Sequence, residues 1–151
     1  MRLNHRGQLV RALRELNKKE LKYFYAIVTH YWVNYRSFIS EQNFLNLWCE
    51  ASKLCYEVEE NFPDIYEQHK QLVDYCKEQP YYFIDILDPR LSKRLFCRFL
   101  DKRLDVLAEV ARRLKNGDIK AIYAYINEAL GINKSFDRFA ESTIRHVGAF
   151  S

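Results

Sequence analysis

Two rows of cationic side chains have the clearest potential for chemistry in this sequence. Most of the cations within each row recur every three or four residues, with Lys93 beside the second row, so a helix would present each row on one face. Such rows can follow the phosphates of a nucleic acid. The first row holds Arg11, Arg14, Lys18 and Lys22, and the second holds Arg90, Lys93, Arg94 and Arg98. If residues 6–22 and 89–103 come together, the eight cations form one basic patch.

The charge distribution leaves two uses open for these cations. Residues 1–40 carry a net +6, residues 41–79 a net −6 and residues 80–115 a net +4. The face that carries the second row continues to Asp101, Asp105 and Glu109, which favours a solvated surface with local ion pairs. Nucleic-acid binding is therefore the second functional hypothesis. The acidic segment 41–79 offers another partner, a basic face of a second copy of the chain.

Catalytic and metal-binding patterns are not found in the sequence. Nucleophilic catalysis needs a nucleophile held beside a base, yet no G-x-S-x-G occurs and the four histidines are scattered. We interpret His30 and His69 as core histidines. The sequence contains no Glu-x-x-His, which a di-iron site would need, and no clustered glycines, which a phosphate site would need. We expect no enzyme activity, no cofactor and no metal, and an enzyme with an unrecognised site is the third hypothesis.

The four cysteines indicate a reducing compartment. Cys49, Cys55, Cys76 and Cys97 are widely spaced, with no C-x-x-C pair and no histidine pair to complete a zinc site. We interpret them as buried free thiols. The first seven residues are not followed by the apolar segment of a secretory leader, and the longest apolar run is too short to span a membrane. The sequence therefore predicts a cytoplasmic protein without a membrane partner.

Aromatic side chains supply the leading functional hypothesis. They make up 15% of the chain, and tyrosine in particular is enriched at protein interfaces. The candidate docking residues are Tyr23, Tyr31, Tyr35, Tyr81, Tyr82 and Phe83. The chain is thus interpreted as a non-catalytic helical binding protein, acting through protein–protein interaction or self-association as an adaptor, regulator or assembly factor.

The elements that must position these residues read as helices. Only 4 Gly and 3 Pro occur in 151 residues, and the apolar residues recur at helical spacing. A capping box at residues 17–20 starts the second helix, Ser40 caps the third, and residues 61–63 separate it from a fourth that ends near residue 79. Residues 81–87 are predicted as a short helix, with an extended segment as the alternative.

The second half of the chain contains the longest predicted helix. Asp88 and Pro89 form a start signal, apolar spacing continues to residue 115, and Gly117 ends the helix. Asp118 caps the next helix, Gly131 ends it, and a last helix covers residues 134–147. The connections are short, so the sequence predicts an all-α bundle of about six to eight helices, with a long central helix near 89–115 and a single domain over residues 1–151.

Overall fold

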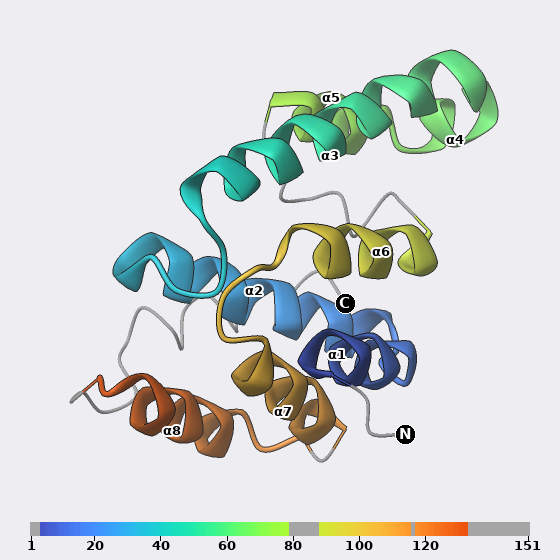
Figure 1. The fold of residues 1–151 in the computed structure, drawn as a ribbon. Helices are drawn as coiled ribbons and strands as arrows, with labels where there is room; N and C mark the ends of the chain where they lie inside the picture. The colour runs from blue at the N-terminus through green and yellow to red at the C-terminus, as the bar shows by residue number, and fades with distance from the viewer. Residues whose placement is uncertain (1–3, 79–87, 116, 133–151) are drawn as a thin grey trace. The chain divides into compact units, whose positions relative to one another are not determined.

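The computed structural model describes residues 4–78, 88–115 and 117–132 (Figure 1). These residues form eight helices and contain no strand, which confirms the all-α class. The predicted segments 81–87, including Tyr81, Tyr82 and Phe83, and 134–147 lie outside the described residues.

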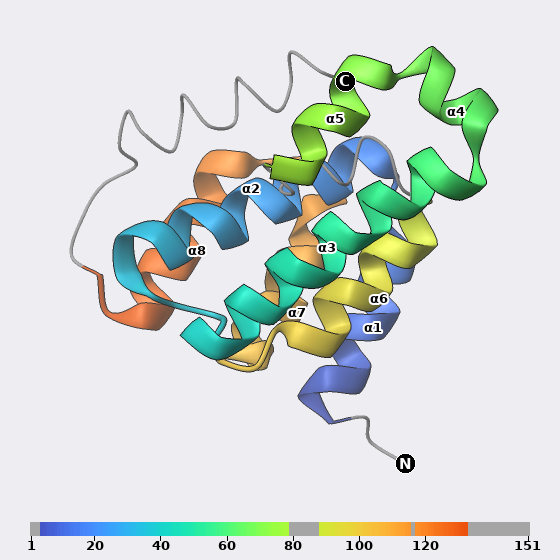
Figure 2. The same ribbon diagram turned by 90° about the horizontal axis from the view of Figure 1, so that it is seen from above.

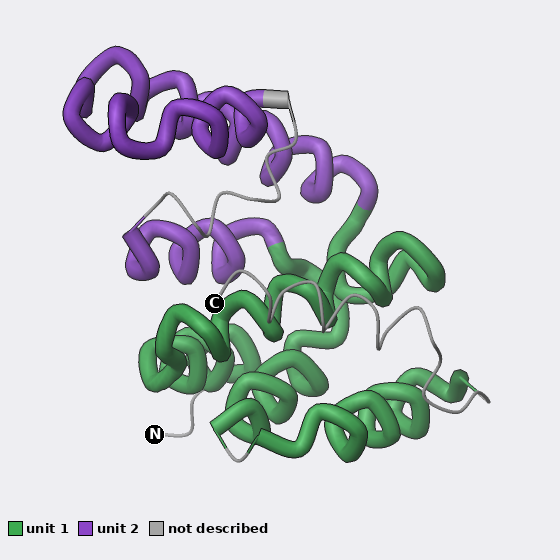
Figure 3. The backbone as a smooth tube through the Cα atoms, turned by 180° about the vertical axis from the view of Figure 1, so that it is seen from behind, with its two compact units in different colours: residues 1–40, 100–151 green, residues 41–99 purple. Residues whose placement is uncertain are grey.

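The helices group into two compact units (Figure 3). Unit 1 comprises residues 1–40 and 100–151, and unit 2 comprises residues 41–99. Unit 1 contains α1 (His5–Arg14), α2 (Lys18–Tyr35), α7 (Leu104–Leu114) and α8 (Ile119–Leu130). Unit 2 contains α3 (Glu41–Asn61), α4 (Pro63–Gln68), α5 (Lys70–Glu78) and α6 (Pro89–Phe99). The expectation of one domain over residues 1–151 stays a prediction.

In unit 1, α7 is the helix that contacts all the others. It packs against α1, α2 and α8, and its own apolar face is buried at Leu107, Val110 and Ala111. Tyr31 of α2 and Tyr123 of α8 stack with their ring centroids 5.7 Å apart. Burial of these aliphatic and aromatic side chains stabilises unit 1 through the hydrophobic effect.

In unit 2, α3 supplies the face on which the other helices gather. It contacts α4, α5 and α6, and Figure 2 shows α3 and α6 side by side. Leu47, Ala51, Cys55 and Val58 recur every three or four residues on α3 and are all buried. This spacing makes one apolar stripe along the helix.

Several predicted helix ends are confirmed. Asn17 accepts from the backbone N–H of Glu20 at 2.8 Å, and Glu20 accepts from the backbone N–H of Asn17 at 2.9 Å, which completes the capping box. Asp118 accepts from the backbone N–H of Ala121 at 3.1 Å at the start of α8. Gly131 ends α8 in the left-handed conformation at φ 71°.

The prediction of one long helix over residues 89–115 is wrong. The chain leaves the helical path after Phe99 and resumes it at Leu104, with Arg103 left-handed at φ 50°. Between them, the backbone N–H groups of Asp101 and Lys102 donate to the carbonyl oxygen of Phe38 at 3.2 and 3.0 Å. These donors would otherwise bond within a helix, so the contact with Phe38 divides it.

A side-chain contact completes this connection. The backbone N–H of Ser40 donates to Oδ1 of Asp101 at 2.8 Å. We call Phe38, Ser40, Asp101 and Lys102 the clasp, because they join the two stretches of unit 1 where the chain leaves it and returns.

The predicted fourth helix is also divided, at His69. This residue has φ −130° and ψ 31°, so it separates α4 from α5, and its side chain is exposed. The interpretation of His69 as a core histidine is therefore wrong. His30 is buried as predicted, with the Tyr31 ring edge-on at 5.0 Å and Nδ2 of Asn34 3.2 Å from its Nδ1.

The four cysteines are free, as predicted, but only two of them are buried. Cys55 and Cys76 lie inside unit 2, whereas Cys49 is exposed and Cys97 is half-buried. Helix α3 explains the difference at Cys49, because its buried stripe passes through Leu47, Ala51 and Cys55 and leaves Cys49 on another face.

Candidate functional site

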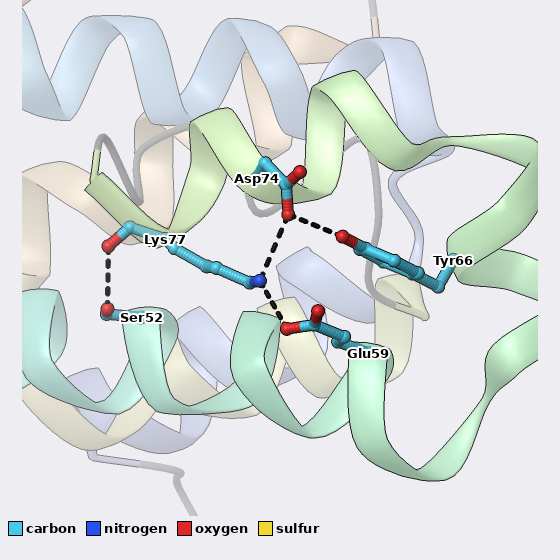
Figure 4. A network of polar contacts seen from close by, with 5 residues as sticks. All are labelled: Ser52, Glu59, Tyr66, Asp74 and Lys77. Atoms are coloured by element: carbon cyan, nitrogen blue, oxygen red, sulfur yellow. Dashed lines mark hydrogen bonds and ion pairs between the residues drawn. The ribbon is translucent and has the colours of Figure 1, made fainter.

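A network of polar contacts lies in unit 2 around Lys77 (Figure 4). The Lys77 ammonium pairs with Glu59 of α3, and its Nζ lies 3.0 Å from Oδ1 of Asp74. The hydroxyl of Tyr66, on α4, donates to the same Asp74 oxygen at 2.9 Å. The hydroxyl of Ser52 donates to the Lys77 carbonyl oxygen at 2.8 Å. These contacts connect α3, α4 and α5.

Two tyrosine rings lie beside the Lys77 ammonium. Nζ lies 5.1 Å from the centroid of the Tyr56 ring and 5.4 Å from that of the Tyr66 ring. Both distances suit attraction between a cation and the face of an aromatic ring. The Lys77 side chain is only 13% exposed, so these rings and the carboxylates replace much of its water shell.

The electrostatics of this Lys77 cluster favour the ordinary protonation states of Lys77, Asp74 and Tyr66 at neutral pH. The pair with Glu59 and the contact with Asp74 raise the pKa of Lys77 despite partial burial. Hydrogen bonds from Lys77 and Tyr66 lower the pKa of Asp74, and the Asp74 acceptor raises the pKa of Tyr66 to about 12. These shifts favour the charged forms of Lys77 and Asp74, which strengthens the contacts that connect the helices.

The lowered pKa of Asp74 predicts an acid-sensitive contact. A carboxylate with a depressed folded-state pKa adds stability above its unfolded value, and that stability is lost as pH falls through the folded value. The pKa of a free Asp side chain is 3.8. We expect wild type to exceed Asp74→Asn in stability at pH 7, and the gap to narrow below about pH 4. Urea unfolding followed by Trp48 fluorescence in a Trp32→Phe background measures the gap.

The control for this prediction is Asp64→Asn. Asp64 is an exposed acid of α4 that lies outside the Lys77 cluster. The difference in stability between Asp64→Asn and wild type should change less with pH than the difference between Asp74→Asn and wild type. A gap for Asp74→Asn that stays the same from pH 7 to pH 3 would show that Asp74 does not stabilise the contact.

An exposed surface that mixes apolar and acidic side chains adjoins the Lys77 cluster. Tyr56, Phe62 and Ile65 are exposed by 51%, 55% and 42%. Residues 56–69 contain five acids and no Lys or Arg. We call this surface the acidic end of unit 2, defined by the exposed residues Tyr56, Glu59, Glu60, Phe62, Asp64, Ile65 and Glu67.

The two predicted rows of cations lie in different units. In unit 1, Arg11, Arg14 and Lys18 are exposed, but Lys22 is only 6% exposed and contributes little to any surface. The burial of Lys22 follows from its place next to Leu21 on α2, a helix buried on most of its faces. The union of the two rows into one patch stays a prediction.

The second row is confined to α6 of unit 2. Arg90, Arg94 and Arg98 are exposed and Lys93 is half-buried. Arg90 pairs with Asp88 at 3.3 Å, and the Arg98 guanidinium lies 5.1 Å from the centroid of the Phe99 ring. Local pairing of this kind agrees with the interpretation of a solvated charged face.

Of the three predicted docking aromatics on α2, Tyr31 is buried inside unit 1. Tyr31 is 1% exposed, and its hydroxyl donates to Oδ1 of Asn127 at 2.6 Å, so it cannot dock a partner. Tyr23 and Tyr35 are half-buried. Tyr81, Tyr82 and Phe83 lie outside the described residues. Tyr56, Phe62 and Ile65 were not predicted; the available signal was Phe62 directly before Pro63 and Ile65 two residues after it.

Among the described side chains, no group of three or more His, Cys, Asp or Glu residues could hold a metal ion. Over the same part of the chain, no helix combines the length and apolar character needed to cross a membrane. The chain matches no protein-family model, no curated protein and no solved structure.

Proposed function

We propose that this chain is a non-catalytic binding protein that docks another protein through the acidic end of unit 2. The partner is a protein segment that carries Lys and Arg around apolar side chains. It would place the apolar side chains against Tyr56, Phe62 and Ile65, and its cations against the surrounding acids.

The observation that carries this proposal is the exposure of α4. None of its residues is buried, although it contains Ile65 and follows Phe62 directly. Large apolar side chains in water add nothing to the stability of unit 2, and adjoining exposed ones mark interaction sites. Aromatic residues at the centre of such a surface commonly supply most of the binding energy.

Charge selects the chemistry of the partner. Segment 41–79 has nine acids and three Lys or Arg residues, and one of these bases, Lys77, is already engaged by Glu59 and Asp74. Glu60, Asp64 and Glu67 are exposed, and each lies within two residues of Phe62 or Ile65 in the sequence. An acidic rim attracts a basic partner at long range and repels an acidic one, which gives both speed and specificity.

The Lys77 cluster gives this surface a fixed frame. It joins α3 to α5 through Glu59 and to α4 through Tyr66, and these helices carry the acidic end of unit 2. A surface held in place before binding loses less conformational entropy when the partner docks.

Site-specific cross-linking tests the proposal in cells that express the protein naturally. A photoreactive benzoylphenylalanine at position 62 replaces one exposed aromatic ring with another. We expect it to form an adduct with a protein whose cross-linked segment is rich in Lys and Arg. Reversing Glu60, Asp64 and Glu67 to Lys should lower the adduct yield about tenfold or more.

The same photoreactive residue at Gln42 is the control. Gln42 is exposed on α3, about 30 Å along the helix axis from position 62 at 1.5 Å per residue. Equal yields at the two positions, or a yield unchanged by the charge reversals, would contradict the proposal. An adduct with twice the mass of the chain would mean that a second copy, rather than a separate partner, occupies the surface.

A further inference from the structure

The contacts between α3 and α5 place two cysteines opposite each other. Ser52 of α3 bonds to the carbonyl oxygen of Lys77, and Glu59, two turns further along α3, pairs with the Lys77 ammonium beside Asp74. Cys55 lies between Ser52 and Glu59 on the same face of α3, because residues three and four apart share a face. Cys76 precedes Lys77 on α5. The contacts of Ser52 and Glu59 with Lys77 flank Cys55 on α3 and therefore hold Cys55 and Cys76 in register.

The two thiols are buried and in contact. Cys55 and Cys76 are each 0% exposed, and their side chains share a hydrogen bond. That hydrogen bond and the positive charge of Lys77 lower the pKa of the Cys55 thiol, against the opposing effect of burial. A lowered pKa favours the thiolate, which is the nucleophilic form of cysteine.

From this juxtaposition we propose that Cys55 and Cys76 form a reversible disulfide site, oxidised by hydrogen peroxide and reduced by small thiols. The Cys55 thiolate attacks one peroxide oxygen and breaks the O–O bond, which gives a sulfenic acid and releases water after protonation. The Cys76 sulfur then attacks the Cys55 sulfur, and the hydroxyl leaves as a second water. Two thiols and one peroxide thus yield one disulfide and two waters.

Short helices provide the route to the buried sulfurs. Cys76 lies on α5, a helix of nine residues that follows the break at His69 and the fully unburied α4. Transient local opening of a short helix costs less free energy than unfolding of the whole unit. Opening of α5 exposes both thiols, and closing returns them to the same register.

The other two cysteines, Cys49 and Cys97, differ from this pair in exposure and position. Cys49 is exposed and lies on α3 with Cys55, six residues apart, which separates them by about 9 Å along the axis. A disulfide requires Cα atoms about 4.4–6.8 Å apart, so these two cannot pair within the helix. Cys97 lies on α6 and is half-buried. Cys49 and Cys97 can therefore be replaced without removing the proposed pair.

The test uses the full chain with Cys49 and Cys97 both changed to Ser, which leaves only Cys55 and Cys76. After treatment with hydrogen peroxide, we expect the monomer to lose about 2 Da and both thiols that can be titrated after denaturation. Peptide mapping should find one peptide that joins residues 55 and 76. Dithiothreitol should restore both thiols.

Further variants separate pairing from general oxidation. Removing Cys55 or Cys76 in this background should abolish the loss of about 2 Da and leave a single oxidised sulfur. Circular dichroism of each reduced variant reports whether it folds. If a variant without Cys55 or Cys76 does not fold, oxidation of the chain that keeps both cysteines still tests the proposal. Persistence of both thiols, a sulfinic acid in place of the disulfide, or a disulfide-linked dimer would each overturn the proposal.

Discussion

Phe38→Ala is expected to lower the free energy of unfolding of unit 1 by about 3–5 kcal/mol. The Phe38 ring is 0% exposed and meets the Tyr31 ring edge-on, with centroids 5.8 Å apart. Alanine would leave a cavity beside Tyr31. Phe38 has a left-handed backbone at φ 76°, but alanine carries the same backbone cost, so the change reports on the lost ring. Urea unfolding followed by Trp32 in a Trp48→Phe background measures the effect.

A second substitution of the same kind controls for the loss of an aromatic ring. Phe62→Ala removes a ring that is 55% exposed, and its effect on stability should be within about 0.5 kcal/mol. If Phe38→Ala cost as little as Phe62→Ala, the Phe38 ring would not be a core element of unit 1.

Phe96→Ala is expected to destabilise unit 2 by a similar amount, about 3–5 kcal/mol. Phe96 lies on α6 and is 0% exposed, with Leu95 and Phe99 buried beside it. Trp48 of α3 reports the unfolding of unit 2, because it is half-buried and lies in that unit. A Trp32→Phe background removes the signal from unit 1.

The two substitutions together test whether residues 1–151 form one cooperative domain. A single domain would shift the Trp32 and Trp48 transitions equally in both variants. Two independent domains would shift only the transition of the unit that carries the substitution. A Phe96→Ala loss below about 1 kcal/mol in the Trp48 transition would contradict the core role of Phe96.

The local features of the fold could be predicted because local sequence determines them. The capping box of Asn17 and Glu20, the Asp118 cap and the left-handed Gly131 each involve side chains or backbone groups within four residues. Helical periodicity likewise depends on neighbours one turn apart. Such signals give the class and most helix ends from the sequence.

The break after Phe99 could not be predicted, because its cause is distant in sequence. Leu100 and Leu104 keep helical spacing, and residues 100–103 contain no Gly or Pro. The chain breaks because the backbone N–H groups of Asp101 and Lys102 bond to Phe38, more than sixty residues earlier. No local pattern carries that contact.

The Lys77 cluster escaped prediction for a related reason. Its only local sign is the three-residue spacing of Asp74 and Lys77 on one helix. The contributions of Glu59 and Tyr66 depend on the turn from α3 into α4 and on the break at His69, which brings Tyr66 back to Asp74. Spacing also could not show that Lys22 and Tyr31 are buried, because burial depends on which helices cover α2.

The clasp has a consequence for how the chain folds during synthesis. Ser40 and Asp101 are 61 residues apart, and closing a flexible loop of that length costs about 3.6 kcal/mol of entropy. If unit 2 folds first, its two ends, next to Ser40 and Leu100, come together. The entropy of closing the loop is then already lost before the clasp of unit 1 forms. Helices α1 and α2 leave the ribosome long before α7 exists to cover them. Their apolar faces therefore stay open to chaperones, or to aggregation, until more than one hundred residues have been made.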